Sequence, residues 1–179
     1  MQQVTLTLPI RPKPGTVAGK RRKATGDAAE ARVEAMNAAC KLAGVAELHK
    51  IPTDVVVQRN GPRIVGAFHR KRATVDCLGW MLDGTGRAVA VEVKSLNLTR
   101  RGRFPLSDLE PHQRAALASA HAAGAVAVLL VVSGPSVYAV PWVNVAVAIE
   151  YGEASLAMVP GWLARGVYLA PWAAKRKAG

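Results

Sequence analysis

The sequence is poor in acids, cysteines and aromatics, and it has no long apolar run. The two cysteines, Cys40 and Cys77, lack the spacing of a metal site, so we expect two reduced, buried thiols. The longest apolar run, from Ala122 to Val132, is about half the ~20 residues that a membrane-spanning helix needs. No basic segment precedes the mildly apolar N-terminus, which argues against a signal peptide. These features predict a cytoplasmic protein.

Basic residues are in large excess. The 179 residues include 24 Lys and Arg against 12 Asp and Glu, a formal net charge of +12, and 50% are hydrophobic. That hydrophobic content is enough for a packed core and argues against disorder. The combination indicates a folded protein that binds a polyanion, either nucleic acid or an anionic membrane surface. The sequence shows no basic amphipathic helix with a large apolar face, so nucleic acid is the favoured partner and no membrane contact is expected.

The first 24 residues contain several basic residues and no acidic one. We predict that residues 1–24 form a flexible basic arm that contacts phosphates, and that residues 25–179 form a single domain. A solvated tail without a ligand is the alternative. The basic residues of the predicted arm are Arg11, Lys13, Lys20, Arg21, Arg22 and Lys23.

Hydrophobic periodicity along the rest of the chain predicts helices and strands in an α/β order. Helices are predicted over 27–43 and 107–123, with Asp27 and Ser107 as N-caps, and a third after Pro141. The apolar segment 125–132 is typical of a strand buried on both faces of a sheet. We therefore predict an α/β sandwich. The predicted strands are 45–51, 55–58, 64–68, 74–82, 87–94, 125–132 and 137–140.

The turn sequence Asp83-Gly84-Thr85-Gly86 predicts a hairpin between strands 74–82 and 87–94. If the turn centres on Gly84, Asp76 lies directly opposite Glu92, and Glu92 shares its face with Lys94. A shift of one residue would instead put the two carboxylates on opposite faces. The hairpin thus predicts, conditionally, that two carboxylates and an ammonium group converge.

Such a cluster has a specific chemistry. Two facing carboxylates repel each other unless a cation or a proton lies between them, and hard oxygen ligands suit Mg²⁺ or Mn²⁺. A divalent ion there would polarise a phosphodiester and activate water, while Lys94 would neutralise charge on the phosphate. Taken alone, a Glu-x-Lys pair on a strand is more often a weak, solvated ion pair. The opposing Asp76 and the basic composition favour phosphodiester hydrolysis.

The pattern Asp76 … Glu92-Val93-Lys94 resembles the PD-(D/E)xK nuclease superfamily, and the chain more specifically resembles its RecU-type Holliday junction resolvases. The similarity spans about residues 26–142 and implies a restriction-endonuclease-like core, with a mixed central sheet flanked by helices. A chain this compact would suit a phage enzyme. The segments that carry the similarity are Gly26-Asp27 with Glu30, His49–Thr53, Thr74–Asp76 with Leu78-Gly79, Glu92–Ser95, Arg103–Leu106 and His112-Gln113.

The resemblance implies a role for each matching residue. Asp76 and Glu92 would bind Mg²⁺ or Mn²⁺ together with the Val93 carbonyl, and Lys94 would be the catalytic lysine. Glu30 would support the metal or a water, and its alternative role is to cap the first helix. Gln113 would lie beside the site, and its alternative is an ordinary surface position. The resemblance also implies a homodimer that nicks four-way DNA junctions symmetrically in recombination and repair, without a small-molecule cofactor.

Two more basic clusters flank the proposed site, and we expect both to contact DNA phosphates rather than to be merely solvated loops. The segment from Pro52 to Asp76, with its tip at 58–63, is shorter than the stalk of the family, and the chain after Trp142 has no counterpart. A nuclease for other DNA substrates and a non-catalytic DNA-binding module remain the alternatives. The clusters comprise Arg70, Lys71 and Arg72, and Arg100, Arg101 and Arg103.

Overall fold

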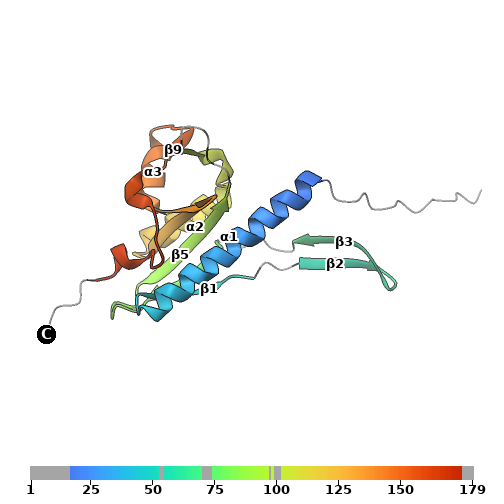
Figure 1. Ribbon diagram of the computed structural model, residues 1–179, viewed down its shortest axis with the longest axis horizontal. Coiled ribbons are helices and arrows are strands. Elements are labelled where there is room, and N and C mark those ends of the chain that lie inside the picture. Colours follow the sequence, from blue (N-terminus) through green and yellow to red (C-terminus); the bar gives the residue numbers. More distant parts are fainter. Residues whose placement is uncertain (1–16, 53–54, 70–73, 97, 99–101, 175–179) are drawn as a thin grey trace, which may run out of the picture.

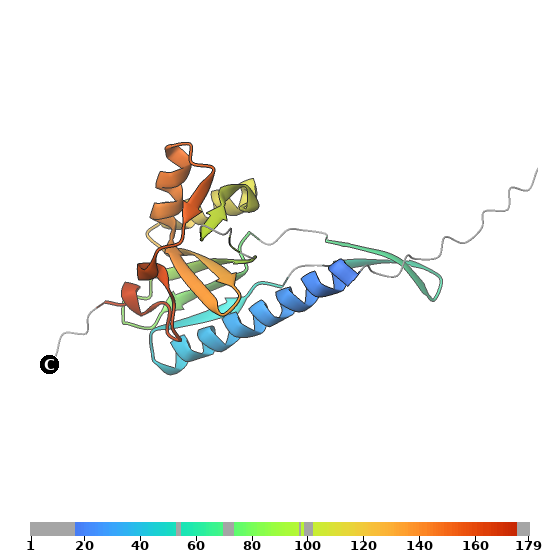
Figure 2. The same cartoon turned by 45° about the horizontal axis from the view of Figure 1, so that its top comes forward.

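The computed structural model describes residues 17–52, 55–69, 74–96, 98 and 102–174. A five-stranded mixed sheet, in the order β1-β4-β5-β7-β8, forms the centre (Figure 1). Helix α1 covers one face of this sheet, and α2 and α3 cover the other (Figure 2). The predicted mixed sheet flanked by helices is therefore confirmed, and it is compatible with a restriction-endonuclease-like core.

The elements follow the predicted order. No helix in the described part of the chain is long and apolar enough to cross a membrane. The helices are α1 (Val17–Leu42), α2 (Pro111–Ala122) and α3 (Trp142–Glu150), with 3-10 helices η1 (Leu106–Asp108), η2 (Pro160–Trp162) and η3 (Ala170–Trp172). The strands are β1 (Ala46–Lys50), β2 (Val55–Asn60), β3 (Arg63–His69), β4 (Cys77–Met81), β5 (Ala88–Ser95), β6 (Arg103–Pro105), β7 (Val126–Ser133), β8 (Ser136–Pro141) and β9 (Ser155–Ala157).

Strand β5 lies at the centre of the sheet. It pairs antiparallel with β4 and parallel with β7, and α2 lies in the connection between the two parallel strands. Strand β7 is buried from Val126 to Val132, as its uninterrupted apolar sequence predicts. The end of β5, from Glu92 to Ser95, is paired with β7 alone, because the β4 ladder ends at Val91.

Helix α1 begins at Val17, well before the predicted start at Asp27, so that prediction is wrong. Residues 17–24, which we assigned to the flexible arm, form its first turns. Gly26 costs only about 1 kcal/mol in a helix interior, and the Ala, Lys and Arg residues around it are strong helix formers. Asp27 therefore lies inside the helix and does not cap it.

Helix α2 begins at Pro111, not at Ser107, because residues 106–108 form the separate helix η1. Proline suits the first helical position, since its φ is fixed and it has no N–H to satisfy. Glu110 is the N-cap: its side chain accepts a hydrogen bond from the N–H of Gln113, and Gln113 Oε1 accepts one from the N–H of Glu110 at 2.9 Å. This capping box replaces the one predicted for Ser107 and Glu110.

The β2–β3 hairpin projects away from the central sheet, on the side toward which the N-terminal end of α1 also extends (Figures 1 and 2). Its turn is at Gly61, whose φ of 61° is readily adopted by glycine. The predicted tip at 58–63 is thus confirmed as a hairpin end.

The chain after β9 returns to the α1 side of the sheet, which the sequence did not predict. Tyr168 and Leu169 are buried in the same core cluster as Val33 of α1. The Tyr168 hydroxyl donates a hydrogen bond to Asn37 Oδ1 at 2.9 Å. Residues 160–174, the C-terminal segment, therefore complete the core on that side from Ala164 onward, while Trp162 packs on the opposite side.

Candidate active site

The β4–β5 hairpin has the register that a turn centred on Gly84 predicts. Cys77 pairs with Val91, and the pairing continues to Trp80 with Ala88. Because β4 begins at Cys77, Asp76 lies immediately before the strand, at the position that continues this register to Glu92. The turn at Gly84 therefore gives the predicted register, and Asp76 lies at the position expected from it.

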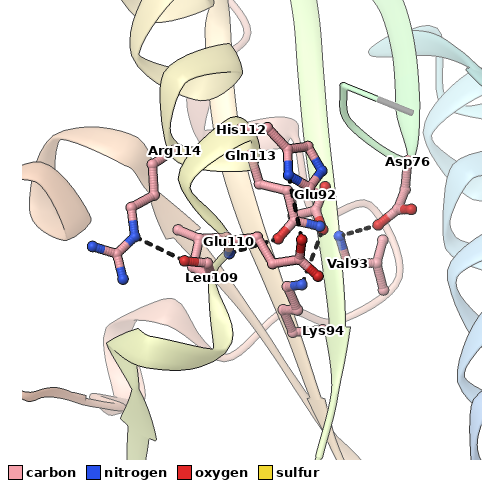
Figure 3. Close-up of polar contacts among 9 residues, drawn as sticks. All are labelled: Asp76, Glu92, Val93, Lys94, Leu109, Glu110, His112, Gln113 and Arg114. Carbon is pink, nitrogen blue, oxygen red and sulfur yellow. Dashed lines mark hydrogen bonds and ion pairs between the residues drawn. The ribbon is translucent and has the colours of Figure 1, made fainter. Parts of the chain in front are cut away.

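Asp76 is held through both its side chain and its backbone. Its Oδ2 accepts a hydrogen bond from the backbone N–H of Val93 at 2.8 Å, beyond the end of the β4 ladder (Figure 3). The N–H of Ile51 donates to the Asp76 carbonyl, also at 2.8 Å. Burial raises the pKa of Asp76 above its usual value, and the Val93 N–H and the Lys94 charge oppose this shift. Asp76 is therefore a fixed, partly desolvated carboxylate.

Glu92 is the one polar or charged side chain that is buried among the residues the structure describes, with an exposed fraction of 2%. Its Oε1 accepts a hydrogen bond from the Gln113 side-chain amide and lies 3.4 Å from Lys94 Nζ. Burial first, and then the negative charge of Asp76, raise the pKa of Glu92 to about 7, against the effect of Lys94. A buried carboxylate of this kind favours the uptake of a proton or a cation.

The start of α2 forms the other side of the site (Figure 3). Gln113 connects Glu92 to the capping box, because its Nε2 donates to Glu92 while its Oε1 accepts from the Glu110 N–H. The Glu110 carboxylate contributes to the raised pKa of Glu92, and it lies 3.4 Å from His112 Nδ1. We did not predict Glu110 and His112 as part of the site. The sequence signal for them is Pro111, because proline is a typical first residue of a helix and its two neighbours therefore lie at the start of α2.

A pocket of about 150 Å³ lies between α1 and the sheet, next to Asp76. Glu30 lines it, and its Oε2 forms an ion pair of 2.6 Å with Lys50 Nζ; Glu34 lies 3.9 Å from the same nitrogen. The charge of Glu30 acts to raise the pKa of Asp76, and that of Lys50 to lower it. Glu30 therefore approaches the site from the α1 side and is already paired.

The structure brings the predicted site residues together in part. Asp76, Glu92, Lys94 and Gln113 lie around Val93, whereas Glu30 lies across the pocket. No group of three or more His, Cys, Asp or Glu side chains in the described ranges is arranged to hold a metal ion. The three acids are thus not one cluster. The chemistry of Asp76 and Glu92 is nevertheless compatible with Mg²⁺ or Mn²⁺, since such ions commonly take only one or two protein carboxylates and keep several waters.

Among the predicted phosphate contacts, only the Arg103 side chain is described. Its Nε donates to Ser155 Oγ at 2.8 Å, and its Nη2 lies 3.3 Å from Glu153 Oε2, so it is held against β9. Lys20, Arg21, Arg22 and Lys23 lie on the first turns of α1. The others lie outside the described residues: Arg11, Lys13, Arg70, Lys71, Arg72, Arg100 and Arg101.

Comparison with known proteins identifies the family of the chain. The family RecU, described as recombination protein U, matches residues 24–155, which is most of the chain. The match includes α1 from residue 24 onward, the β4–β5 hairpin and the start of α2, the elements that carry Asp76, Glu92, Lys94 and Gln113. No curated protein matches the chain. The family match shows that the chain belongs to RecU, a family of Holliday junction resolvases that act in recombination.

Proposed function

We propose that the protein is a metal-dependent, structure-selective DNA endonuclease that resolves four-way junctions by symmetric phosphodiester hydrolysis in recombination and repair. The observation that carries this proposal is Glu92, a buried carboxylate whose pKa is raised to about 7 by burial and by Asp76. If Glu92 had only a structural role, an apolar residue at this position would be expected to make the fold more stable. In a chain of net charge +12, the acidic pair is expected where a metal meets a phosphate.

Asp76 and Glu92 would hold Mg²⁺ or Mn²⁺, with the Val93 carbonyl as a further ligand and Glu30 supporting the metal or a water from the pocket. When bound, a divalent ion supplies a Lewis acid and lowers the pKa of a water. The raised pKa of Glu92 means that ligation near neutral pH releases a proton from this side chain. Metal affinity is therefore expected to increase with pH.

Lys94 has the role of a positive charge beside the scissile phosphate. Its side chain is 18% exposed and its Nζ is 3.4 Å from Glu92 Oε1, so the ammonium group is partly desolvated. Such a charge stabilises the negative charge that develops on the phosphate oxygens, or orients the attacking water. Gln113 does not need to touch DNA; it fixes the orientation of Glu92.

The substrate is proposed to be branched DNA held through its phosphates by the basic residues predicted from the sequence. Symmetric nicking needs two identical sites, so we propose that the active form is a homodimer. The β2–β3 hairpin, which projects away from the central sheet, is proposed to contact the DNA (Figure 1).

The test uses an end-labelled four-way junction with Mg²⁺, with Mn²⁺, or with a chelator, in competition with linear duplex at moderate salt. The proposal predicts paired nicks at symmetric positions, only with a divalent ion, and little cutting of the duplex. Equal cutting of both DNAs would instead indicate a nuclease for other substrates. Binding without any metal-dependent cleavage would indicate a DNA-binding module. An Asp76→Asn preparation, purified in parallel, controls for contaminating nucleases.

A further inference from the structure

Arg114 holds the connection between η1 and α2 in place (Figure 3). Its Nε donates a hydrogen bond to the carbonyl oxygen of Leu109 at 2.8 Å, and its Nη2 donates one to that of Leu106 at 2.5 Å. Leu106 and Leu109 are both buried in the core on the α2 side of the sheet. A guanidinium group has its donors in a rigid, planar fork, so it can hold two carbonyls at once. Arg114 therefore fixes the backbone that leads into α2.

The Leu109 carbonyl belongs to the same peptide group as the N–H of Glu110. Arg114 holds the carbonyl end of this group, and the Glu110 N–H at the other end donates to Gln113 Oε1 at 2.9 Å. Because a peptide group is planar and rigid, fixing its carbonyl also fixes the direction of its N–H. A donor on the carbonyl also strengthens the hydrogen bond that the N–H makes. Arg114 and Gln113 are therefore coupled through one peptide group.

The direction of the Glu110 N–H decides which atom of the Gln113 amide faces Glu92. A glutamine amide has an oxygen that accepts and a nitrogen that donates. With the N–H directed at Gln113 Oε1, the Nε2 group is left to donate to Glu92 Oε1. If the peptide group turned over, its carbonyl would face the Gln113 amide, which would then present its oxygen to Glu92. Glu92 would lose the hydrogen bond that orients it, and a buried carboxylate without its donor is costly.

We propose that Arg114 is a positioning residue of the candidate active site: it holds the Leu109–Glu110 peptide group so that the Gln113 amide donates to Glu92. Arg114 acts through Gln113 and does not need to contact DNA. Its effect on cleavage rests on the proposed function, whereas its effect on the orientation of Gln113 does not. A purely structural clamp would stabilise the connection between η1 and α2 without changing the side chain of Gln113.

The first measurement follows the side-chain amide resonances of Gln113 by nitrogen–proton correlation NMR, without metal. They are identified as the pair that is missing in Gln113→Ala. Arg114→Met retains an apolar stem but loses both hydrogen bonds, and it is expected to shift this pair toward the position of solvent-exposed glutamine amides. Arg32→Met is the matched control, because Arg32 also donates to two backbone carbonyls, those of Gly134 and Pro135 in the β7–β8 turn. The control should leave the Gln113 resonances in place.

The second measurement is a double-mutant cycle on junction cleavage. Arg114→Met should reduce the cleavage rate at saturating DNA about tenfold, because a small misplacement of groups at the reacting centre is costly. Adding Gln113→Ala should cause no loss beyond that of Gln113→Ala alone, since Arg114 acts through Gln113. Losses from a purely structural role would multiply instead. If circular dichroism shows that Arg114→Met is unfolded, Arg114→Lys replaces it in both measurements, because an ammonium group lacks the fork that holds both carbonyls.

Unchanged Gln113 resonances in the Arg114 variant, an equal shift in Arg32→Met, or multiplying losses in the double variant would overturn the inference. A wild type that does not cleave junctions with Mg²⁺ or Mn²⁺ would refute the proposed function. The Gln113 resonances alone would then decide the role of Arg114.

Discussion

The side-chain amide of Gln113 donates a hydrogen bond to Glu92 Oε1, and this contact joins the first turn of α2 to the central strand β5 (Figure 3). The Gln113 Oε1 accepts at the same time from the N–H of Glu110, the N-cap of the helix. The side chain of Gln113 therefore both caps α2 and orients the buried carboxylate of Glu92. A change at Gln113 is expected to alter both.

Replacing Gln113 by Glu should shift the pH dependence of cleavage. The variant retains an oxygen for the Glu110 N–H but places a second carboxylate against Glu92, whose pKa then increases above about 7. Cleavage should decrease severalfold at about pH 7 and recover in part at about pH 8.5, where more of Glu92 is ionised. Gln113→Ala, in contrast, should lose about 1 kcal/mol of stability with the cap. A similar activity ratio for Gln113→Glu at both pH values would contradict the assigned contact.

Replacing Glu92 by Gln should make folding stability less dependent on pH when no metal is present. The folded protein holds the Glu92 proton more tightly than the unfolded chain, with a pKa of about 7 against 4.5. The resulting stabilisation is complete below pH 4.5 and is lost as pH rises through 7, up to about 3 kcal/mol. Glu92→Gln removes this loss and should be more stable than the wild type at about pH 8.

Urea unfolding with a chelator, at about pH 5 and about pH 8, measures the effect of Glu92→Gln. The matched control is Glu34→Gln, since the Glu34 side chain is 64% exposed. The control should follow the wild type at both pH values. If Glu92→Gln lost stability between these two pH values as steeply as the wild type, Glu92 would not be the buried acid described above.

Asp76→Asn and Lys94→Ala should each reduce junction cleavage at least about 100-fold, the size of effect seen when a charge-stabilising group is removed. The asparagine side chain would retain an oxygen that can accept from the Val93 N–H, so the fold should persist while the ligand charge is lost. Junction binding, measured by gel shift, should change little. Asp108→Asn, at an exposed position of η1, is the control and should cleave like the wild type. Cleavage by either site variant would refute the assignment.

Removing the charge of Lys50 should reduce the cleavage rate more at low pH than at high pH. Lys50 helps to lower the pKa of Asp76, so Lys50→Met should raise that pKa and move the acidic limb of the pH–rate profile to higher pH. Stability should decrease by less than about 1 kcal/mol, because the Lys50–Glu30 pair is exposed. Lys41→Met, which breaks an exposed pair with Glu47, is the control. Parallel pH profiles for both variants would contradict this role.

The C-terminal segment should be essential for folding although it lies outside the family match. Leu169 is fully buried in the α1-side core, and Leu169→Ala should cost about 2–5 kcal/mol. A chain ending at residue 155 should lose its cooperative thermal transition, followed by circular dichroism. A chain ending at residue 174 retains Tyr168 and Leu169 and should melt like the full chain. Normal melting of the shorter chain would show that the family region folds alone.

Features set by local chemistry could be predicted from the sequence. The Gly84 turn determines the β4–β5 register, and Asp76 lies one residue before β4 at the position that continues this register. The apolar run in β7 predicted a strand buried on both faces, and the structure pairs this strand with β5. These elements define the centre of the site.

The wrong helix starts arose where two local signals competed. Gly26 with Asp27 indicated a start that the helix-forming residues before them overrode, and Ser107 competed with Pro111 for the start of α2. The burial of Tyr168 could not be predicted, because it depends on Asn37 in α1 and no local pattern encodes that contact. The pairing of Glu30 with Lys50 depends in the same way on packing of α1 against β1.

The hydrogen bond between Tyr168 and Asn37 also has a consequence for the order of folding. It joins residues 131 positions apart, so this part of the core can close only after Tyr168 has been synthesised. Until then the apolar side of α1, with Val33 and Met36, is not fully covered. Long-range closure of this kind slows folding and prolongs the exposure of apolar surface. The nascent chain is therefore expected to need protection from aggregation until Tyr168 and Leu169 have emerged.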